Sequence, residues 1–208
     1  MKKSILLGLV CLGLSSLSVQ AQERGQNEFS VSALGSFQRS STGNGINQSA
    51  DGTPGLSVSY RYFFNAHHGL EMDYGFRRYD QQFSALGASA PFTGRYVIPA
   101  DTHEGTMSYV YRFASAHRLK PFVNAGVGAL VFAPTQLAGN STVGTSTLAT
   151  ADFVYGGGAE LALSPQLNLR FGYRGHFFEA PDLGLATLYT GSRTHMAEPF
   201  LGLTFRFR

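Results

Sequence analysis

Apolar and polar residues alternate strictly through most of the chain after residue 28. An extended strand points successive side chains to opposite faces, so each alternating segment predicts a strand with one apolar face and one polar or small face. The prediction is an all-β protein of one domain, with no linker between parts. The eight predicted strands cover 29–37, 56–64, 70–77, 106–113, 123–131, 153–163, 167–176 and 199–207.

The links between these segments alternate in length. Short links lie near 65–68, 114–119 and 164–166. The long links are rich in Ser, Thr, Gly, Asn and Ala, and cover 40–54, 84–102, 133–150 and 179–195. Four long and three short links are what an eight-stranded antiparallel up-and-down barrel requires when both chain ends lie on the same side.

The polar faces carry charges of both signs and many glycines, whereas the apolar faces carry aromatic residues near their ends. A barrel with its apolar face on lipid would bring those charges together as ion pairs in a narrow lumen. The reverse assignment in a membrane would put Arg170 and Arg174 on lipid, at about 2–4 kcal/mol each. A soluble lipocalin-like barrel is the alternative. The predicted structural network of the lumen consists of Arg61, Glu71, Asp73, Arg77, Arg112, Glu160, Arg170, Arg174 and Arg206.

The first 21 residues have the features of a cleaved signal peptide. Lys2 and Lys3 precede a short apolar run, and Val19-Gln20-Ala21 supplies a cleavage site. We therefore predict a signal peptide at 1–21 and a barrel domain at 22–208. Removing two lysines leaves a nearly neutral chain without a basic patch, which gives no indication of nucleic-acid binding. The only cysteine of the 208 residues, Cys11, would leave with the peptide.

Two segments resemble a known family. The runs from Lys120 to Gly128 and from Tyr155 to Tyr173 are similar to the small outer-membrane β-barrel domain, which includes the membrane domain of outer-membrane protein A and the opacity-type porin-family proteins. The resemblance implies a monomeric transmembrane β-barrel of the cell outer membrane. Its implied partners are membrane lipid and lipopolysaccharide, and, during biogenesis, periplasmic chaperones and the barrel-assembly machinery.

The last strand fits the closing strand of such a barrel. One face is apolar, and we predict that it acts as an assembly signal. Arg208 follows it, where members of the family usually end on an aromatic residue. The predicted signal consists of Leu201, Leu203, Phe205 and Phe207.

The sequence predicts no catalytic, cofactor or metal site. His176 and Glu179 could meet His195 and Glu198 at the outer rim, but no Ser in a nucleophile setting accompanies them. His67-His68, in a short turn, and His103-Glu104 are interpreted as solvated polar residues. The predicted function is a non-enzymatic structural or surface-interaction role through the long outer loops, whose ligand is unknown. A narrow passive-diffusion pore is the alternative, followed by a lipid A-modifying enzyme.

Overall fold

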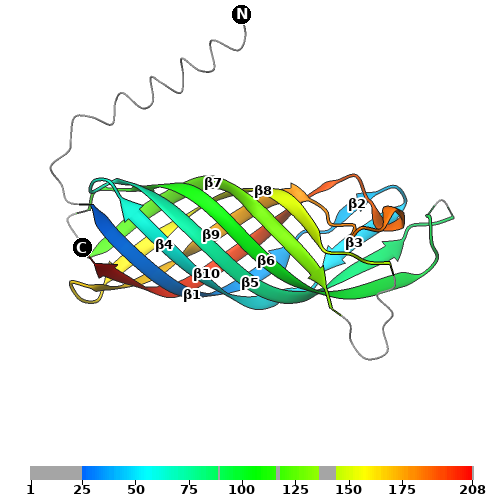
Figure 1. Ribbon diagram of the computed structural model, residues 1–208, viewed down its shortest axis with the longest axis horizontal. Coiled ribbons are helices and arrows are strands. Elements are labelled where there is room, and N and C mark those ends of the chain that lie inside the picture. The colour runs from blue at the N-terminus through cyan, green and yellow to red at the C-terminus, as the bar shows by residue number, and fades with distance from the viewer. Residues whose placement is uncertain (1–24, 89, 116–117, 136–143, 208) are drawn as a thin grey trace, which may run out of the picture.

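The chain forms a closed antiparallel β-barrel of eight strands (Figure 1). The computed structural model describes residues 25–88, 90–115, 118–135 and 144–207. The predicted signal peptide at 1–21 and Arg208 therefore lie outside the described residues. The barrel strands are β1 (Gln26–Gln38), β4 (Thr53–Phe63), β5 (His68–Ala85), β6 (Arg95–Arg112), β7 (Leu119–Pro134), β8 (Leu148–Ala162), β9 (Leu167–Glu179) and β10 (Arg193–Phe207).

Two pairings turn the sheet into a barrel. Each strand pairs with its neighbour along the chain, and β1 also pairs with β10, with Phe29 opposite Phe205. The pairing of β5 with β6, from His68 opposite Tyr111 to Ser84 opposite Arg95, joins the two ends of the strand order. Closure leaves no unpaired strand edge in the wall, which a lipid environment demands. The predicted fold class is therefore confirmed.

The short links are tight turns held by side chains. In the turn between β4 and β5, Asn65 Oδ1 accepts hydrogen bonds from the backbone N–H groups of His67 and His68, both at 2.9 Å. Between β8 and β9, Ser164 Oγ accepts from the N–H groups of Gln166 and Leu167. Asn and Ser are favoured in turns because they satisfy backbone donors in this way. These turns lie at the end of the barrel where β1 begins and β10 ends, which we call the turn end (Figure 1).

At the opposite end, called the loop end, the predicted links at 40–54 and 84–102 are wrong in part. The first contains β2 (Ser41–Gly43) and β3 (Ile46–Ala50), and the second contains the last two residues of β5 and the first eight residues of β6. These parts of the strands do not face lipid. Their outward residues are therefore not required to be apolar, and no strict apolar–polar alternation marks them as strands. The hairpin of β2 and β3 did have a signal, because Asn44-Gly45 takes the positive φ angles (49° and 75°) of a two-residue hairpin turn.

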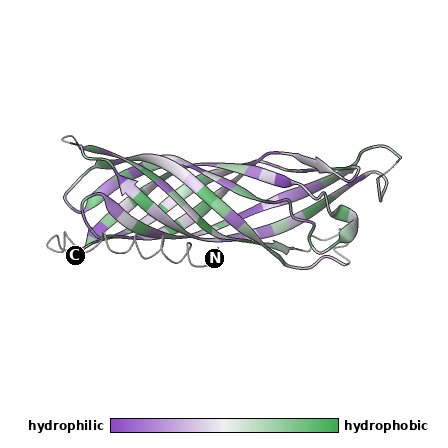
Figure 2. Ribbon diagram, turned by 90° about the horizontal axis from the view of Figure 1, so that it is seen from above, coloured by the Kyte–Doolittle hydropathy of each residue, from purple (hydrophilic) through white to green (hydrophobic). Residues whose placement is uncertain are grey.

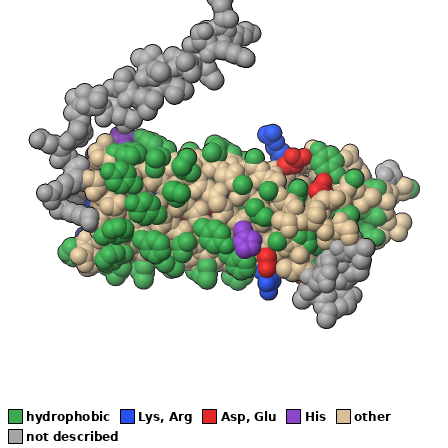
Figure 3. Space-filling model, viewed as in Figure 1, with side chains coloured by type: hydrophobic (Ala, Val, Ile, Leu, Met, Phe, Trp, Pro, Cys, Tyr) green, Lys and Arg blue, Asp and Glu red, His purple; other side chains and the backbone are tan. Residues whose placement is uncertain are grey.

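The outer surface is apolar near the turn end and mixed near the loop end (Figure 3), and hydrophobic and hydrophilic residues alternate along the strands (Figure 2). Many of the exposed apolar side chains are aromatic. On β5 the outward apolar positions run from Leu70 to Phe76, and the next outward residue is Arg78. Arg78 donates two hydrogen bonds to Asp101 of β6, through Nε and, at 2.9 Å, through Nη2. These bonds lower the pKa of Asp101, which stays charged at neutral pH. This pair marks where the lipid-facing surface ends on these strands.

Helical structure is slight. The 3-10 helix η2 (Ala186–Leu188) lies in the link between β9 and β10. Among the described residues, no helix is long and apolar enough to cross a membrane.

Candidate functional site: the lumen and the loop end

The charged residues that the sequence assigns to the lumen lie on the inner wall of the barrel. None of them exposes more than 12% of its side chain, so they are shielded from lipid and from bulk water alike. The nine residues are Arg61, Glu71, Asp73, Arg77, Arg112, Glu160, Arg170, Arg174 and Arg206.

In the half of the lumen nearer the turn end, Arg61 and Glu160 join strands from opposite sides of the barrel. Arg61 donates from Nη1 to Glu160 Oε1 at 2.6 Å and from Nη2 to Glu71 Oε2 at 2.8 Å. Arg112 Nη2 donates to both oxygens of Glu28, at 2.7 and 2.8 Å. Buried charges are tolerated only when they are paired in this way. The other close pairs are Arg112–Glu160 at 3.1 Å, Arg170–Glu71 at 2.6 Å, Arg206–Glu28 at 2.9 Å and Arg206–Glu160 at 3.1 Å.

Aromatic rings fill the space beside these guanidinium groups. The Arg112 guanidinium lies 3.8 Å from the centre of the Phe63 ring, and that of Arg61 lies 4.4 Å from the centre of the Phe122 ring. Phe200, on the polar face of the closing strand, is buried in the same cluster. Cation–π contacts of this kind strengthen when water is excluded. The lumen at this level is therefore packed with side chains.

A second group of charges lies nearer the loop end and is built on Arg77 and Arg174. Arg77 Nη1 donates to Glu104 Oε2 at 2.9 Å and also to Glu198 Oε1. Arg174 lies 3.2 Å from Glu198 Oε2 and 3.1 Å from Asp73 Oδ1. Four strands thus meet at one level of the lumen, which ties the wall together across the barrel.

His176 completes this second group. Its imidazole is fully buried, and its Nδ1 lies 2.7 Å from Asp152 Oδ2. Its Nε2 lies 3.2 Å from Glu198 Oε2 and 3.9 Å from Glu104 Oε1. The ring is therefore surrounded by three carboxylates.

Five lumen residues were not among those predicted from the sequence. These residues can be predicted by extending the inward–outward alternation of side chains to the ends of each strand. Glu104 lies on the same face of β6 as Thr106 and is buried, so its interpretation as a solvated residue is wrong. The five residues are Glu28, Glu104, Asp152, His176 and Glu198.

The rim cluster considered from the sequence does not form. His176 and Glu198 face the lumen, whereas His195 lies on the outer wall with Nε2 3.0 Å from the Tyr155 hydroxyl. Glu179 is exposed, and its Oε1 accepts a hydrogen bond from the Tyr189 hydroxyl at 3.1 Å. The alternation within β9 and β10 therefore places His176 and Glu198 together in the lumen, and His195 and Glu179 on the other side of the wall.

The other histidines that the structure describes lie on the outer wall or in a turn. His67 Nδ1 is 2.9 Å from the backbone oxygen of Arg112, beside the turn between β4 and β5. His103 Nδ1 is 2.8 Å from the Tyr74 hydroxyl on the outer face. Neither histidine enters the lumen.

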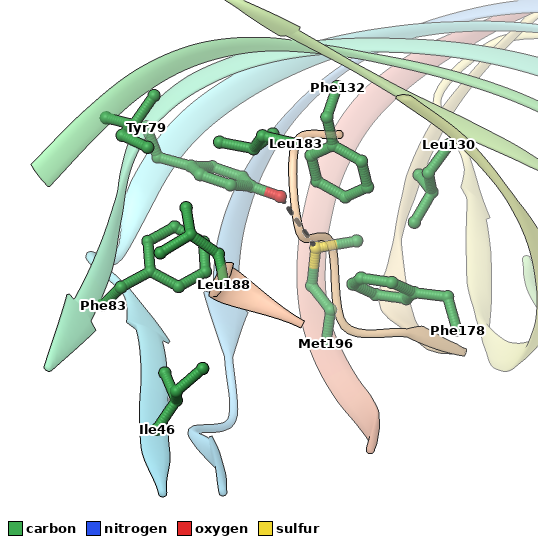
Figure 4. Close-up of a cluster of buried hydrophobic side chains, with 10 residues drawn as sticks. Ile46, Tyr79, Phe83, Leu130, Phe132, Phe178, Leu183, Leu188 and Met196 are labelled. Carbon is green, nitrogen blue, oxygen red and sulfur yellow. Dashed lines mark hydrogen bonds between the residues drawn. The ribbon is translucent and has the colours of Figure 1, made fainter. Parts of the chain in front are cut away.

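The mouth at the loop end is filled by the link between β9 and β10 (Figure 4). Leu183 and Leu188 of this link are buried among side chains from the surrounding strands. Leu183 has a positive φ of 54°, and the backbone N–H of Ser146 donates to its oxygen at 2.8 Å. We call this cluster the mouth plug, and it consists of Ile46, Tyr79, Phe83, Ile98, Leu130, Phe132, Phe178, Leu183, Leu188 and Met196.

Beside the mouth plug, a partly open cavity of about 810 Å³ lies at the loop end. Phe92, Tyr96 and Leu185 give it apolar walls, and Arg95 is the charged residue in its lining. Concave sites with mainly apolar walls and a few polar groups are typical of ligand binding.

Residues 9–191 match the outer membrane protein beta-barrel domain. The chain belongs to this family. Outer-membrane β-barrels have short turns on the periplasmic side and longer loops outside the cell. No curated protein matches the sequence.

Solved structures share the fold of this outer-membrane barrel at low sequence identity. OprG of Pseudomonas aeruginosa is 14% identical, with a TM-score of 0.63 over 92% of this chain and all of that chain. Neisserial surface protein A is 17% identical, with a TM-score of 0.60 over 89% of this chain and all of that one. Ail of Yersinia pestis, in complex with the heparin analogue sucrose octasulfate, is 17% identical, with a TM-score of 0.53 and the same coverage.

Proposed function

We propose that this protein is a non-enzymatic, monomeric outer-membrane scaffold that acts through surface interactions at its extracellular end. The observation that carries the proposal is the filling of the barrel. Ion pairs around Arg61 and Arg77 occupy the lumen at two levels, and the mouth plug covers them. Eight strands leave an interior just wide enough for side chains, so the space for partners lies outside.

The extracellular rim supports this role because it is built from strands. Beyond Arg78, β5 continues to Ala85, and β3 pairs with it from Ile46 opposite Ala85 to Ala50 opposite Gln81. Binding surfaces are commonly carried by rigid scaffolds of this kind. Charges of both signs are mixed here, which favours partners that bind through hydrogen bonds and shape over partners held by charge. The charged residues of the described rim include Arg39, Arg78, Arg95 and Arg193, and Asp51, Asp80, Asp101, Glu179 and Asp182.

A narrow diffusion pore is the second candidate. Several buried polar atoms on the inner faces of β6 and β7 have no hydrogen-bond partner in the described residues, including Thr106 Oγ1, Ser108 Oγ and both side-chain atoms of Asn124. Such atoms are commonly satisfied by buried water. A continuous row of water molecules along this wall would allow slow passage of water or very small solutes.

A lipid A-modifying enzyme is the third candidate. The recorded ring partners of His176 are carboxylates, and those of His195 are the hydroxyls of Tyr155 and Tyr173. A Ser nucleophile oriented by a histidine would give a different set of contacts. Unchanged lipid A mass spectra in cells with and without the protein would count against an enzyme.

The proposal is tested by comparing cells that lack the protein with cells that carry it or its Tyr96→Ala variant, which alters the cavity. We expect loss of the protein to change adhesion to glycan-coated or host-cell surfaces, and Tyr96→Ala to change it in part. Detergent and antibiotic permeability should change little. In planar bilayers the purified protein should give no steady large openings. Steady openings, with adhesion unchanged, would favour the pore.

A further inference from the structure

Three buried side chains from three different strands converge in the outer half of the lumen. Glu104 comes from β6, His176 from β9 and Glu198 from β10. One ligand atom of each lies within 4.8 Å of the others, and all three residues are almost fully buried. A zinc ion binds imidazole nitrogen and carboxylate oxygen at about 2.0–2.2 Å, so donors about 3–4 Å apart can share one ion.

Two of these atoms have no hydrogen-bond partner among the residues that the structure describes. His176 Nε2 lies 3.2 Å from Glu198 Oε2, but the ring is not aligned to donate to it. Glu104 Oε1 is also without a hydrogen bond, although Arg174 Nη1 lies 3.5 Å away. A buried polar atom that lacks a partner is costly. The two atoms lie 3.9 Å apart.

Neighbouring side chains hold the Glu104, His176 and Glu198 side chains in position through hydrogen bonds. Asp152 binds Nδ1 of His176 at 2.7 Å, which leaves Nε2 free to act as a ligand when Nδ1 carries the proton. Arg77 binds the far oxygen of both glutamates, Oε2 of Glu104 and Oε1 of Glu198. Metal-binding histidines commonly donate their other N–H to a carboxylate, and ligand carboxylates are commonly hydrogen-bonded in turn.

The net charge of the surrounding side chains also favours a bound cation. With a neutral imidazole, this level of the lumen holds four carboxylates and two guanidinium groups, and one divalent ion would balance them. The carboxylates belong to Asp73, Glu104, Asp152 and Glu198, and the guanidinium groups to Arg77 and Arg174.

We propose that Glu104, His176 and Glu198 form a binding site for one divalent transition-metal ion, with zinc as the best match. One imidazole and two carboxylates suit zinc and its neighbours in the first row better than calcium or magnesium, which prefer oxygen alone. The enclosed position means that the ion enters as the barrel folds. Its role is structural, because it joins three strands at the level just below the mouth plug.

Arg174 would compete with the metal ion for a carboxylate oxygen of Glu198. Its Nη2 lies 3.2 Å from Glu198 Oε2, the oxygen that would face the metal. Replacing it by the uncharged Arg174→Gln should therefore tighten metal binding. This increase is the opposite of what general damage to the lumen would cause.

The test uses the full barrel without a polyhistidine tag, unfolded in urea with a chelator and refolded in detergent micelles with zinc chloride or cobalt chloride. Folding is checked by comparing boiled and unboiled samples on a gel. Bound zinc per chain is measured by elemental analysis after gel filtration, and cobalt by its visible absorption. The variants are His176→Gln, Glu104→Gln, Asp152→Asn and Arg174→Gln. Matched controls are Ser108→Ala, on the same strand as Glu104, and the double change His67→Ala with His68→Ala.

We expect about one zinc per folded chain, retained by both controls and lost in His176→Gln and Glu104→Gln. Asp152→Asn should weaken binding about 10–100-fold. The proposal is overturned if the unaltered protein retains no zinc. It is also overturned if folded His176→Gln retains as much as the unaltered protein, or if zinc depends on His67 and His68. Should the ligand variants fail to fold, the zinc content of the unaltered protein and the stronger retention of zinc by Arg174→Gln against a competing chelator still decide.

Discussion

Arg61 on β4 and Glu160 on β8 meet across the lumen, with 2.6 Å between Nη1 and Oε1, although their strands are not neighbours in the sheet. The backbone hydrogen bonds of a barrel join only adjacent strands. This ion pair therefore adds a cross-link that the wall itself cannot supply.

Removing one partner of this pair should lower the stability of the folded barrel. In Glu160→Gln, Arg61, Arg112 and Arg206 each lose one carboxylate, and although Arg61 keeps Glu71 and the other two keep Glu28, the buried group is left with one positive charge that is no longer balanced. We expect the free energy of unfolding to fall by about 3–5 kcal/mol, the usual effect of stranding a buried charge. Urea unfolding of the refolded barrel in lipid vesicles measures it.

Two variants serve as comparisons for that measurement. Arg78→Ala removes an exposed ion pair and should leave the unfolding midpoint nearly unchanged. The double variant Arg61→Met with Glu160→Met should lose less than the sum of the single changes, since the two residues interact directly. Additive losses would contradict the cross-link.

A second prediction concerns the close contact between β8 and β9. Gly158 lies opposite Gly172, and a Cβ added at Gly158 would lie 2.2 Å from the backbone oxygen of Phe171. Gly158→Ala should destabilise the barrel by about 1–3 kcal/mol, as overpacking does. Gly105→Ala is the matched control, because a Cβ there meets nothing within 4 Å. The fraction of folded protein on unboiled gels measures both, and equal fractions would refute the prediction.

The mouth plug provides a third prediction. Leu183 is fully buried in it, and its strained positive φ persists because the side chain packs against the plug. Leu183→Ala should cost about 2–5 kcal/mol locally and should speed cleavage of the link between β9 and β10 by added protease. Thr187→Ala, at an exposed position of the same link, should leave cleavage unchanged. Unaltered cleavage of Leu183→Ala would mean that the plug is not held by this side chain.

The closing strand gives a fourth prediction. Phe207 pairs with Asn27 of β1 and stacks on Phe205 at the turn end. Deleting Phe207 and Arg208 together should impair assembly into the outer membrane, while deleting Arg208 alone should not. Membrane fractionation with the gel-shift assay measures both, and normal insertion of the double deletion would show that this segment is not an assembly signal.

The wall of this barrel is predictable from sequence because lipid imposes a period of two on every strand that it touches. From Leu70 to Phe76 each outward side chain is apolar, so the strand, its faces and the position of Arg77 all follow. Beyond Arg78 that constraint ends, and the extensions of β5 and β6 carry no comparable pattern.

The chemistry of the lumen is less predictable, for a related reason. Parity assigns a residue to the inner face, but it says nothing about which strand lies across the lumen. The approach of Glu104, His176 and Glu198 depends on the closure of β5 on β6 and on the stagger of every strand between them. Sequence reasoning therefore found inward charges but not their partners.

The continuation of β5 beyond Arg78 also determines how far the rim of the barrel stands above the lipid-facing surface. The eight residues from Arg78 to Ala85 rise by up to about 25 Å at the usual 3.3 Å per residue. Even with the tilt of about 35–45° that barrel strands have, we expect the paired strands to carry the rim clear of the lipid headgroups. Large molecules that never reach the lipid could then touch this protein.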